Sequence, residues 1–401
     1  MKSAVKALIA AALLAAGLWW YYTQMIPPPM GEQRENFIKK TGLAKIGLVC
    51  PTSNTSFING ANLAVEQVNE RGGLLGARLS LDPRDDQNDK DAGVNIAKSL
   101  LKDVGIAGVT GHMTSDNAIA ASLIYNMGGM VFLAPQATST YLTLHRFETV
   151  FRTIVSDKDV SRELVAYLRK KGLNKLVVAS EQSRYGSDFS NLLIDSTGRM
   201  GIKIASHKFF FETDTDFRHG LLTVLNEDFD SIFIAGHLPA GALLIKQIRE
   251  MGFQQQIITG GALTSPQLIS LAGKASEGVV VAAHFNLSDK SDPDMVNFVA
   301  KYKARYNMEP DQNSARGYEA VWLLTQGIER AKSFNPVVIA STMKVAKNWQ
   351  GLSGTYSFSR YGNVQGRRVY LETVKNGKFV PLEEFTLKTG VDSPDQALVE
   401  D

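Results

Sequence analysis

The sequence predicts an α/β protein with two doubly wound parallel-sheet lobes of similar size, preceded by an N-terminal hydrophobic helix. Short apolar runs alternate with amphipathic stretches of about 10–15 residues, which is typical of βαβ units and parallel sheets. This alternation occurs in two consecutive series along the chain. The 401 residues are also enough to bury two cores of ordinary size.

The clearest single unit opens the first series, over residues 46–76. An apolar strand at 46–49 is followed by a turn at 51–55, and apolar residues then recur at helical spacing through 57–70. Two glycines, Gly72 and Gly73, end this helix, because glycine tolerates the left-handed conformation of a helix end.

The remaining elements follow the same pattern. The first series has expected strands at 45–49, 77–82, 106–110, 130–134 and 149–154. Its expected helices are 57–70, 91–103, 115–127 and 138–145. The second series has expected strands at 175–180, 203–210, 230–235, 256–259 and 277–283. Its expected helices are 158–171, 187–200, 214–227, 239–251 and 265–273.

The last part of the chain does not begin a third lobe. Long helices expected at 292–306 and 313–332 have apolar faces that require a sheet to cover. The segments 367–375 and 378–387 are expected to form a hairpin that turns at Asn376-Gly377, a dipeptide favoured in tight turns.

The N-terminus, residues 1–26, is expected to be a signal peptide or a membrane anchor. Residues 7–22 form an apolar or aromatic run of 16 residues, between the lengths of a signal-peptide core and a transmembrane helix. The aromatic residues 19–22 resemble an interfacial belt and favour an uncleaved tether. Either outcome places the folded body in the periplasm or at the outer face of the cytoplasmic membrane. Residues 27–43 are expected to be a short stiff linker.

The composition narrows the function classes. A net charge of +3 from 43 basic and 40 acidic residues does not favour a nucleic-acid partner. The sequence has no zinc-type Cys/His cluster, HExxH, P-loop, GxGxxG or GxSxG motif, so no metal or cofactor is expected. Its single cysteine, Cys50, cannot form an internal disulfide and is expected to be a buried, inert thiol.

Six short motifs occur in a characteristic order: NERGGLLG at 69–76, RDDQND at 84–89, TGHMTSDNA at 110–118, LAPQATS at 133–139, EQSRYGSDF at 181–189 and LAGKASEGVVV at 271–281. With these motifs, the chain from about residue 44 to 387 resembles a type I periplasmic solute-binding protein of the branched-chain amino acid (Leu/Ile/Val-binding) family. This resemblance implies two lobes joined by three hinge crossovers. Lobe one would comprise 44–153 plus 285–350, lobe two 154–284 plus 351–388, and 389–401 a C-terminal tail.

The resemblance also implies the function: the extracytoplasmic solute-binding component of an ABC transporter for amino acid transport. A small carboxylate, amide or amino acid ligand would bind between the lobes, and the partner would be an ABC permease in the inner membrane. A second possibility is a membrane-tethered sensing module that serves a separate receptor. An enzyme is not expected, because Ser115 and His112 form the sole nearby nucleophile–base pair and lack the spacing of a triad.

Thr114 and Ser115 lie where a ligand is expected, beyond the carboxyl end of a strand and at the start of a helix. A hydroxyl and free backbone N–H groups at a helix N-terminus can bind an anion, although either side chain could simply cap the helix. The resemblance assigns Ser115 to the ligand carboxylate. It implies further ligand-binding roles for the companion loop Gln136, Ala137 and Thr138, and for Tyr185, His237, Tyr318 and Phe57.

One departure from the family pattern concerns specificity. Amino acid binders of this family carry an acidic residue after the strand at 256–259, where it pairs with the ligand ammonium. Here the stretch around Gly261 contains no acid, although Asp116, Asp188 or Glu181 could substitute. The simplest expectation is a ligand with a carboxylate or amide head and no α-ammonium in the usual place. Arg316 could reach a second anionic group, but a solvated side chain is the favoured interpretation.

Overall fold

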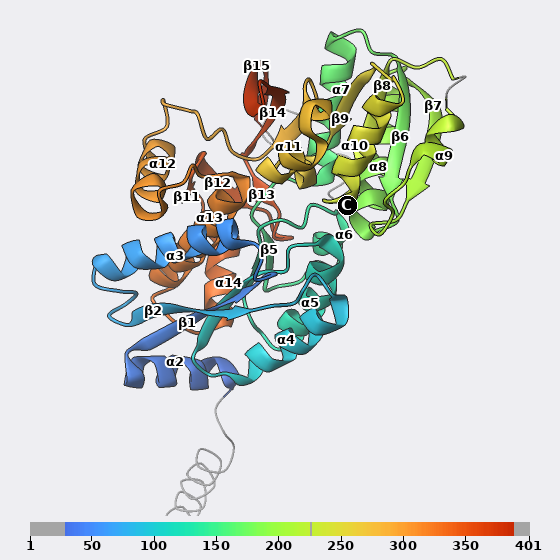
Figure 1. Ribbon diagram of the computed structural model, residues 1–401. Helices are drawn as coiled ribbons and strands as arrows, with labels where there is room; N and C mark the ends of the chain where they lie inside the picture. Colours follow the sequence, from blue (N-terminus) through green and yellow to red (C-terminus); the bar gives the residue numbers. More distant parts are fainter. Residues whose placement is uncertain (1–28, 225–226, 389–401) are drawn as a thin grey trace, which may run out of the picture.

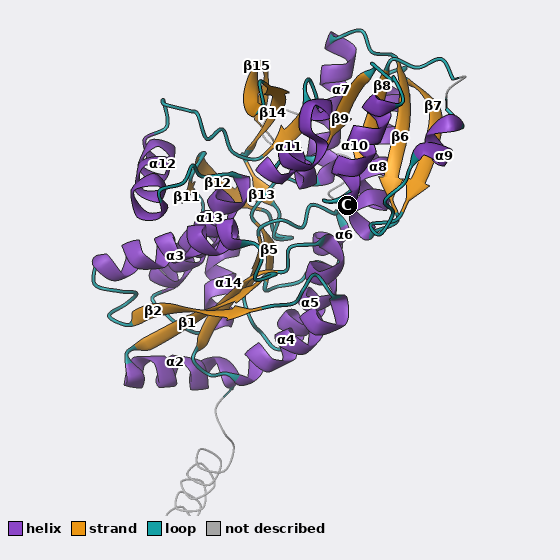
Figure 2. Cartoon of the chain, in the orientation of Figure 1, coloured by secondary structure: helices purple, strands orange, loops and turns teal. Residues whose placement is uncertain are grey.

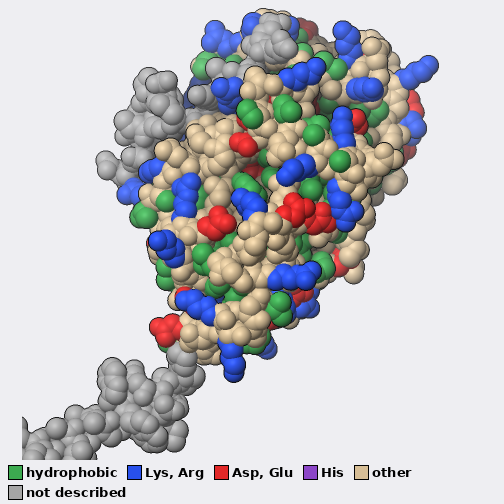
Figure 3. Space-filling model, turned by 90° about the vertical axis from the view of Figure 1, so that its left-hand side faces the viewer, with side chains coloured by type: hydrophobic (Ala, Val, Ile, Leu, Met, Phe, Trp, Pro, Cys, Tyr) green, Lys and Arg blue, Asp and Glu red, His purple; other side chains and the backbone are tan. Residues whose placement is uncertain are grey.

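The computed structural model describes residues 29–224 and 227–388 as two α/β lobes, each with helices on both faces of a sheet (Figures 1 and 2). The expected signal peptide or anchor at 1–26 and the tail at 389–401 lie outside these residues. Within the described part, no helix combines the length and apolar character needed to cross a membrane. On the face in Figure 3, basic and acidic side chains are interspersed.

Lobe one is built on a five-stranded parallel sheet of order β2-β1-β3-β4-β5, which confirms the first predicted series. Its strands are β1 (Leu43–Val49), β2 (Arg78–Arg84), β3 (Ile106–Gly111), β4 (Phe132–Ala134) and β5 (Val150–Arg152). The central strand β3 is buried along its whole length, because helices cover both of its faces. Cys50, just after β1, is a buried free thiol whose pKa burial raises to about 12, as an inert cysteine requires.

The helices of lobe one are α3 (Thr55–Glu70), α4 (Lys90–Lys102), α5 (Ser115–Met127), α6 (Tyr141–Leu144), α12 (Pro293–Tyr306), α13 (Gln312–Ala331) and α14 (Pro336–Val345). The backbones of α3 and α13 cross closely, and a side chain at Gly60 or Gly317 would overlap a carbonyl oxygen of the other helix. Helix α14 was not predicted, although Asn335 caps it and Pro336 occupies its first turn.

Lobe two has a seven-stranded sheet of order β15-β14-β10-β9-β8-β6-β7. Its parallel strands are β6 (Lys175–Glu181), β7 (Lys203–Phe210), β8 (Ser231–Ala235), β9 (Gln256–Thr259) and β10 (Val280–Ala283). The antiparallel strands β14 (Arg368–Lys375) and β15 (Lys378–Lys388) confirm the predicted hairpin. Both turn residues, Asn376 and Gly377, have positive φ, as a tight hairpin turn requires.

The helices of lobe two are α7 (Asp157–Lys170), α8 (Arg184–Arg199), α9 (Arg218–Leu222), α10 (Ala240–Glu250) and α11 (Pro266–Ala272), with short 3₁₀ turns η1 (Gly261–Leu263) and η2 (Gly273–Ser276). The helix expected at 214–227 is much shorter than predicted. Residues Asp214 and Asp216 instead accept hydrogen bonds from nearby backbone N–H groups and hold a turn before α9.

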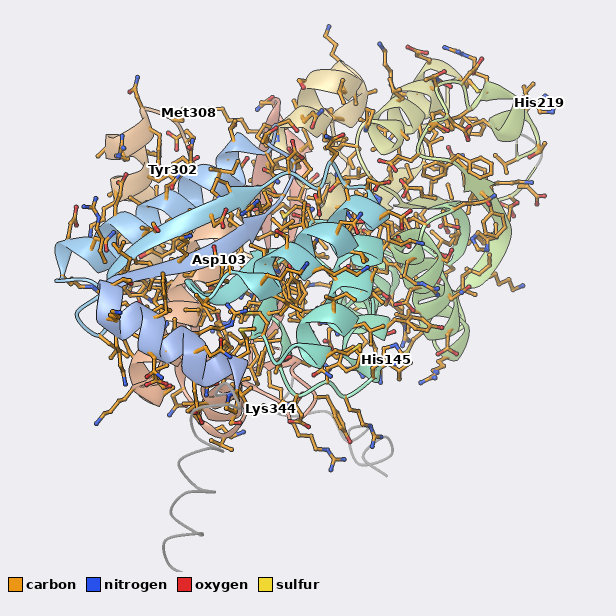
Figure 4. All side chains as sticks on the ribbon, turned by 90° about the horizontal axis from the view of Figure 1, so that it is seen from below. Asp103, His145, His219, Tyr302, Met308 and Lys344 are labelled. Carbon is orange, nitrogen blue, oxygen red and sulfur yellow. The ribbon has the colours of Figure 1, made fainter. Side chains whose placement is uncertain are left out.

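The linker prediction for 27–43 is wrong, because most of this segment is the helix α2 (Met30–Thr41). Arg34, which is 1% exposed, anchors α2 on lobe one. Its guanidinium donates hydrogen bonds to the carbonyl oxygens of Leu101, Asp103 and Ile106, and Asp103 lies beside α2 in Figure 4. The buried residues of this helix are Arg34 and Ile38, four positions apart on one face, and Ile38 packs in the core of lobe one. Two buried positions are too few to give a clear amphipathic pattern in the sequence.

A small sheet follows α14 and consists of β11 (Trp349–Gly351), β12 (Gly354–Phe358) and β13 (Val364–Gln365). It was not predicted. Its apolar residues, including Tyr356 and Phe358, pack in the core of lobe one, whereas the sequence analysis assigned residues from 351 onward to lobe two. We propose that the third crossover lies at residues 366–367, directly before β14.

The three crossovers meet at one buried ion pair. Arg367 donates a hydrogen bond to Glu319 of α13, and both side chains are almost fully buried. The same guanidinium donates to the carbonyl oxygens of Thr153 (2.7 Å) and His284 (3.5 Å), which lie in the first and second crossovers. One side chain therefore contacts all three connections between the lobes.

We expect Arg34→Met to lower the free energy of unfolding by about 2–4 kcal/mol, because it leaves three carbonyl oxygens without their charged donor. Urea denaturation of the full chain measures this change. Lys40→Met, an exposed position on the same helix, is the matched control and should change stability by less than about 0.5 kcal/mol. Equal stability of the two variants would show that α2 is not anchored through Arg34.

Candidate functional site

The site in lobe one begins at the tight turn between β3 and α5, residues 111–115. Gly111 and His112 both have positive φ, and a side chain at Gly111 would overlap the carbonyl oxygen of Val49. The turn delivers Thr114 to the N-cap of α5, where its side chain accepts a hydrogen bond from the backbone N–H of Asn117. Thr114 therefore caps the helix, and Ser115 follows at the first helical position.

A buried polar network supports this turn from below. His112 Nδ1 lies 3.1 Å from Asp86 Oδ2, and His112 Nε2 lies 3.0 Å from the hydroxyl of Tyr125. Asp86 also accepts a hydrogen bond from the side-chain amide of Asn117. The network joins the RDDQND and TGHMTSDNA motifs. Because both ring nitrogens of His112 have other partners, the nucleophile–base pair considered for Ser115 is not formed.

Ser115, Gln136 and Thr138 all line an inner pocket. Ser115 Oγ accepts a long hydrogen bond of 3.4 Å from the backbone N–H of Ser139. The side-chain oxygen of Gln136 is buried without a hydrogen-bond partner. These polar atoms can accept or donate bonds to a bound molecule.

Lobe two contributes Tyr185 and His237 to the same inner pocket. Their rings pack against each other in a tilted arrangement, with centroids 4.9 Å apart and planes inclined at 49°. The Tyr185 hydroxyl is buried beside the Ala262 backbone with no hydrogen bond of normal geometry. The carboxylate of Glu181 positions His237. It accepts one hydrogen bond from the backbone N–H of His237 (2.8 Å) and a second from the ring Nδ1 of His237 (2.7 Å). Burial lowers the pKa of His237, but the hydrogen bond and charge of Glu181 outweigh it and raise the net value.

The two lobes are joined across the cleft by Asp188 of α8. It accepts hydrogen bonds from the Ser139 hydroxyl (2.7 Å), the Thr140 backbone N–H (2.7 Å) and the Thr140 hydroxyl (3.0 Å). A second bond runs from the backbone N–H of Arg184 to Asp116 of α5 (3.0 Å). The lobes are therefore closed. Asp116, Asp188 and Glu181, the candidate replacements for the missing acid, all have other partners.

The enclosed space has an outer and an inner part. The outer cleft has a volume of about 400 Å³, and the inner pocket about 10 Å³, close to the size of one water molecule. Both are lined by Met113, Gln136, His237, Ala262 and Arg316, so they form one continuous cleft. The inner pocket is also lined by Ser115, Thr138, Tyr185, Gly261 and His284.

Arg316 corrects the sequence interpretation, which favoured a solvated side chain. It is 3% exposed and lines both parts of the cleft. On α13 it lies two residues from Tyr318, and positions two apart on a helix point in different directions. Tyr318 points away from the cleft into the core of lobe one, where its hydroxyl donates to Gln67 (3.0 Å).

Two other predicted residues also lie in cores rather than in the cleft lining. Phe57 is fully buried in the core of lobe one, because α3 starts two residues before it and turns its ring inward. Ala137 is fully buried in the neighbouring cluster beneath α5. The structure thus brings together Thr114, Ser115, Gln136, Thr138, Tyr185 and His237 around one cleft. It adds Arg316, His284 and Met113, and it leaves Phe57, Ala137 and Tyr318 outside.

We expect Asp188→Ala to open the lobes, because three hydrogen bonds to one carboxylate hold them closed. Bonds to charged groups contribute about 1.5–3 kcal/mol each, so the open form should gain roughly 10-fold or more in population. Small-angle X-ray scattering should report a larger radius of gyration. Asp195→Ala, at an exposed position of the same helix, should leave the scattering unchanged; identical curves for both variants would exclude Asp188 as the inter-lobe contact.

The His237–Glu181 pair should make stability depend on pH. Because the pKa of His237 is raised from 6.5, its contribution is complete below that value and is lost as the pH rises through the raised pKa. Melting temperature measured from about pH 5 to pH 9 should therefore fall less steeply for His237→Gln than for the parent. His219→Gln, at the outer edge of lobe two (Figure 4), should retain the parental slope. A slope unchanged by His237→Gln would refute this linkage.

The chain matches the family model described as periplasmic binding protein over residues 45–378. It is 26% identical over 346 residues to the Leu/Ile/Val-binding protein BraC3 of Rhizobium johnstonii, covering 84% of this chain and 93% of the relative. The solved leucine-binding protein of Thermotoga maritima superposes with a TM-score of 0.81 at 26% identity, covering 88% of this chain and 100% of that one.

A solved ABC transporter substrate-binding protein of Desulfitobacterium hafniense, in complex with Leu, superposes with a TM-score of 0.75 at 29% identity. It covers 84% of this chain and 99% of its own. The match to the family model spans far more than half of the 401 residues, and the two-lobed fold and inter-lobe cleft agree with it. This chain therefore belongs to the type I periplasmic binding proteins, in the branched-chain amino acid family of ABC transporter solute-binding components.

Proposed function

We propose that this protein captures a small carboxylate-bearing solute in the inter-lobe cleft and delivers it to an ABC permease of the inner membrane. Capture would be non-covalent and would take place outside the cytoplasmic membrane, in agreement with the family. The related proteins are named for binding leucine, isoleucine and valine, and one was solved with Leu. We therefore take amino acids and other small carboxylates as the starting point for the ligand class of this chain.

The observation that supports the proposal most is the composition of the inner pocket. Ser115 and Thr138 approach it from lobe one, and Tyr185 and His237 approach it from lobe two. Ser115 stands at the N-terminus of α5, a helix of 13 residues whose free N–H groups and dipole favour negative charge. A carboxylate placed there accepts hydrogen bonds from these N–H groups and is favoured by the helix dipole. A neutral group gains less from the dipole, and a cationic group is repelled by it.

Closure follows from contacts on both lobes. A ligand that docks on Ser115 and Thr138 gains additional contacts with Tyr185 and His237 only when lobe two closes on it. Such differential contact shifts the population toward the closed form. The inter-lobe bonds of Asp188 then hold that form, and a permease would recognise the closed pair of lobes.

A thermal-shift screen of the full chain in non-ionic detergent tests the proposal. The panel contains branched-chain amino acids, aliphatic monocarboxylates and dicarboxylates, and the corresponding amides. A compound at about 100 times its dissociation constant should stabilise the protein by about 2.7 kcal/mol. We expect carboxylates to raise the melting temperature and amides of the same carbon skeleton to do so less. No response from any carboxylate would contradict solute capture at this site.

Ser115→Ala should reduce the affinity for a responding carboxylate by about 10-fold, the loss of one hydrogen bond to a charged group. Ser122→Ala is the matched control, because Ser122 is a buried serine of the same helix whose hydroxyl binds only its own helix backbone at Ile119. Equal effects of the two substitutions would place the carboxylate elsewhere.

A further inference from the structure

Arg316 is a buried cation whose hydrogen-bond partners are neutral. Its Nη1 donates to the side-chain oxygen of Asn313 (2.8 Å), and its Nη2 makes a long bond of 3.4 Å to the carbonyl oxygen of Gly261. Its Nε is buried with no hydrogen-bond partner. Burying a charge without a charged partner is costly, so this arrangement calls for an anion from outside the chain.

The nearest acidic side chain does not supply that anion. Asp311 accepts hydrogen bonds from the backbone N–H of Ser314 (2.8 Å) and from the hydroxyl of Ser56. Burial lowers the pKa of Arg316 to about 10, with Asp311 opposing and Arg367 adding to the decrease. The guanidinium therefore stays charged at neutral pH.

His284 lies on the other side of Gly261 and explains why no acid stands there. A side-chain carbon added to Gly261 would come within 2.9 Å of His284 Nε2, so the imidazole occupies the space that a longer residue would need. Burial, followed by the charges of Arg316 and Arg367, keeps the pKa of His284 well below its usual range. Its ring is neutral, and its Nδ1 is buried without a hydrogen-bond partner.

The charge of the inner pocket follows from its lining. Among the described residues that line it, Arg316 carries a full positive charge and no residue is a carboxylate. In amino acid binders of this family, the resemblance places an acid here for the ligand ammonium. An ammonium in this pocket would instead meet a guanidinium, and like charges at short range in a dry site repel strongly.

We propose that Arg316 and His284 form a second anion-binding subsite, so that the solute is a small dicarboxylate with one carboxylate at Ser115 and the other at Arg316. This inference rests on the proposed function and deepens it. The planar guanidinium suits a carboxylate because it can donate two parallel hydrogen bonds. Ser115 lines the inner pocket, whereas Arg316 lines both the inner pocket and the outer cleft of about 400 Å³, so a short dicarboxylate that reaches both subsites would extend from the inner pocket into the outer cleft.

Isothermal titration calorimetry of the full chain in non-ionic detergent tests this inference with matched pairs of probes. Succinate is compared with butyrate and glutarate with pentanoate, and leucine is the α-amino acid probe. We expect a dicarboxylate to bind more tightly than its monocarboxylate partner and than leucine. Arg316→Gln should weaken the dicarboxylate by about 10- to 100-fold and change the monocarboxylate little.

Arg330→Gln is the matched control, because Arg330 lies on the same helix and donates to the backbone carbonyls of Lys347 and Asn348, far along α13 from the cleft. It should leave every affinity unchanged. Leucine binding that is tighter than dicarboxylate binding, or equal loss for both members of a pair in Arg316→Gln, would overturn the subsite while leaving solute capture intact. Absence of binding by every probe would overturn both.

A ligand-free measurement provides a second, independent readout. If the Arg316 guanidinium is paired only when an anion is bound, the ligand-free Arg316→Gln variant should melt at the parental temperature or higher. The substitution removes a buried charge that has no charged partner in the ligand-free protein. A lower melting temperature would show that the guanidinium is a structural group and would overturn the inference. Arg316→Lys keeps the charge but loses the planar fork, so we expect it to retain part of the preference for the dicarboxylate.

Discussion

The buried ion pair of Arg367 and Glu319 is the interaction on which the two-lobed architecture depends. Glu319 belongs to α13 in lobe one, and Arg367 stands directly before the hairpin of lobe two. The pair is almost fully buried, and its guanidinium also binds backbone oxygens of the two other crossovers. Removing one partner of such a pair leaves an uncompensated buried charge, which makes the junction intolerant of change. The pair thus holds the three connections between the lobes together at one point.

The cleft depends on this junction because its walls come from both sides of it. His284 is part of the second crossover, and its carbonyl oxygen binds Arg367 while its ring faces the inner pocket. Arg316 lies three residues before Glu319 on α13. The crossover junction and the inner pocket therefore share one turn of α13, which carries Arg316 and Glu319, and one crossover residue, His284. A ligand bound at Arg316 and His284, as proposed above, would contact the same elements that connect the two lobes, and such contacts would favour the closed form.

The parallel strands, the final hairpin and most helices could be predicted, because each has a local cause. Period-two and period-3.6 patterns and the Asn376-Gly377 turn are properties of neighbouring residues. The site was predictable only in part. Ser115 and Thr138 follow strand ends, where ligands bind in open parallel sheets, and Tyr185 and His237 follow from the family pattern. Tyr318 and Phe57 were placed in the pocket, but their helices turn them into the core. The helical period could have separated Arg316 from Tyr318, since positions two apart lie on different faces.

The amino-acid sequence by itself determined the order of strands and helices, the two-lobed class and the edge of the sheet that lines the inter-lobe cleft. These features depend on residues close together in the chain. Tertiary structure alone decided that α2 is a helix anchored by Arg34, that Tyr356 and Phe358 pack in the core of lobe one, and that Arg316 is buried in the cleft. Each of these outcomes depends on partners distant in sequence, such as Leu101 for Arg34 and Gly261 for Arg316. Burial of a charge has no local signature, because it depends on which distant backbone oxygens and side chains surround it.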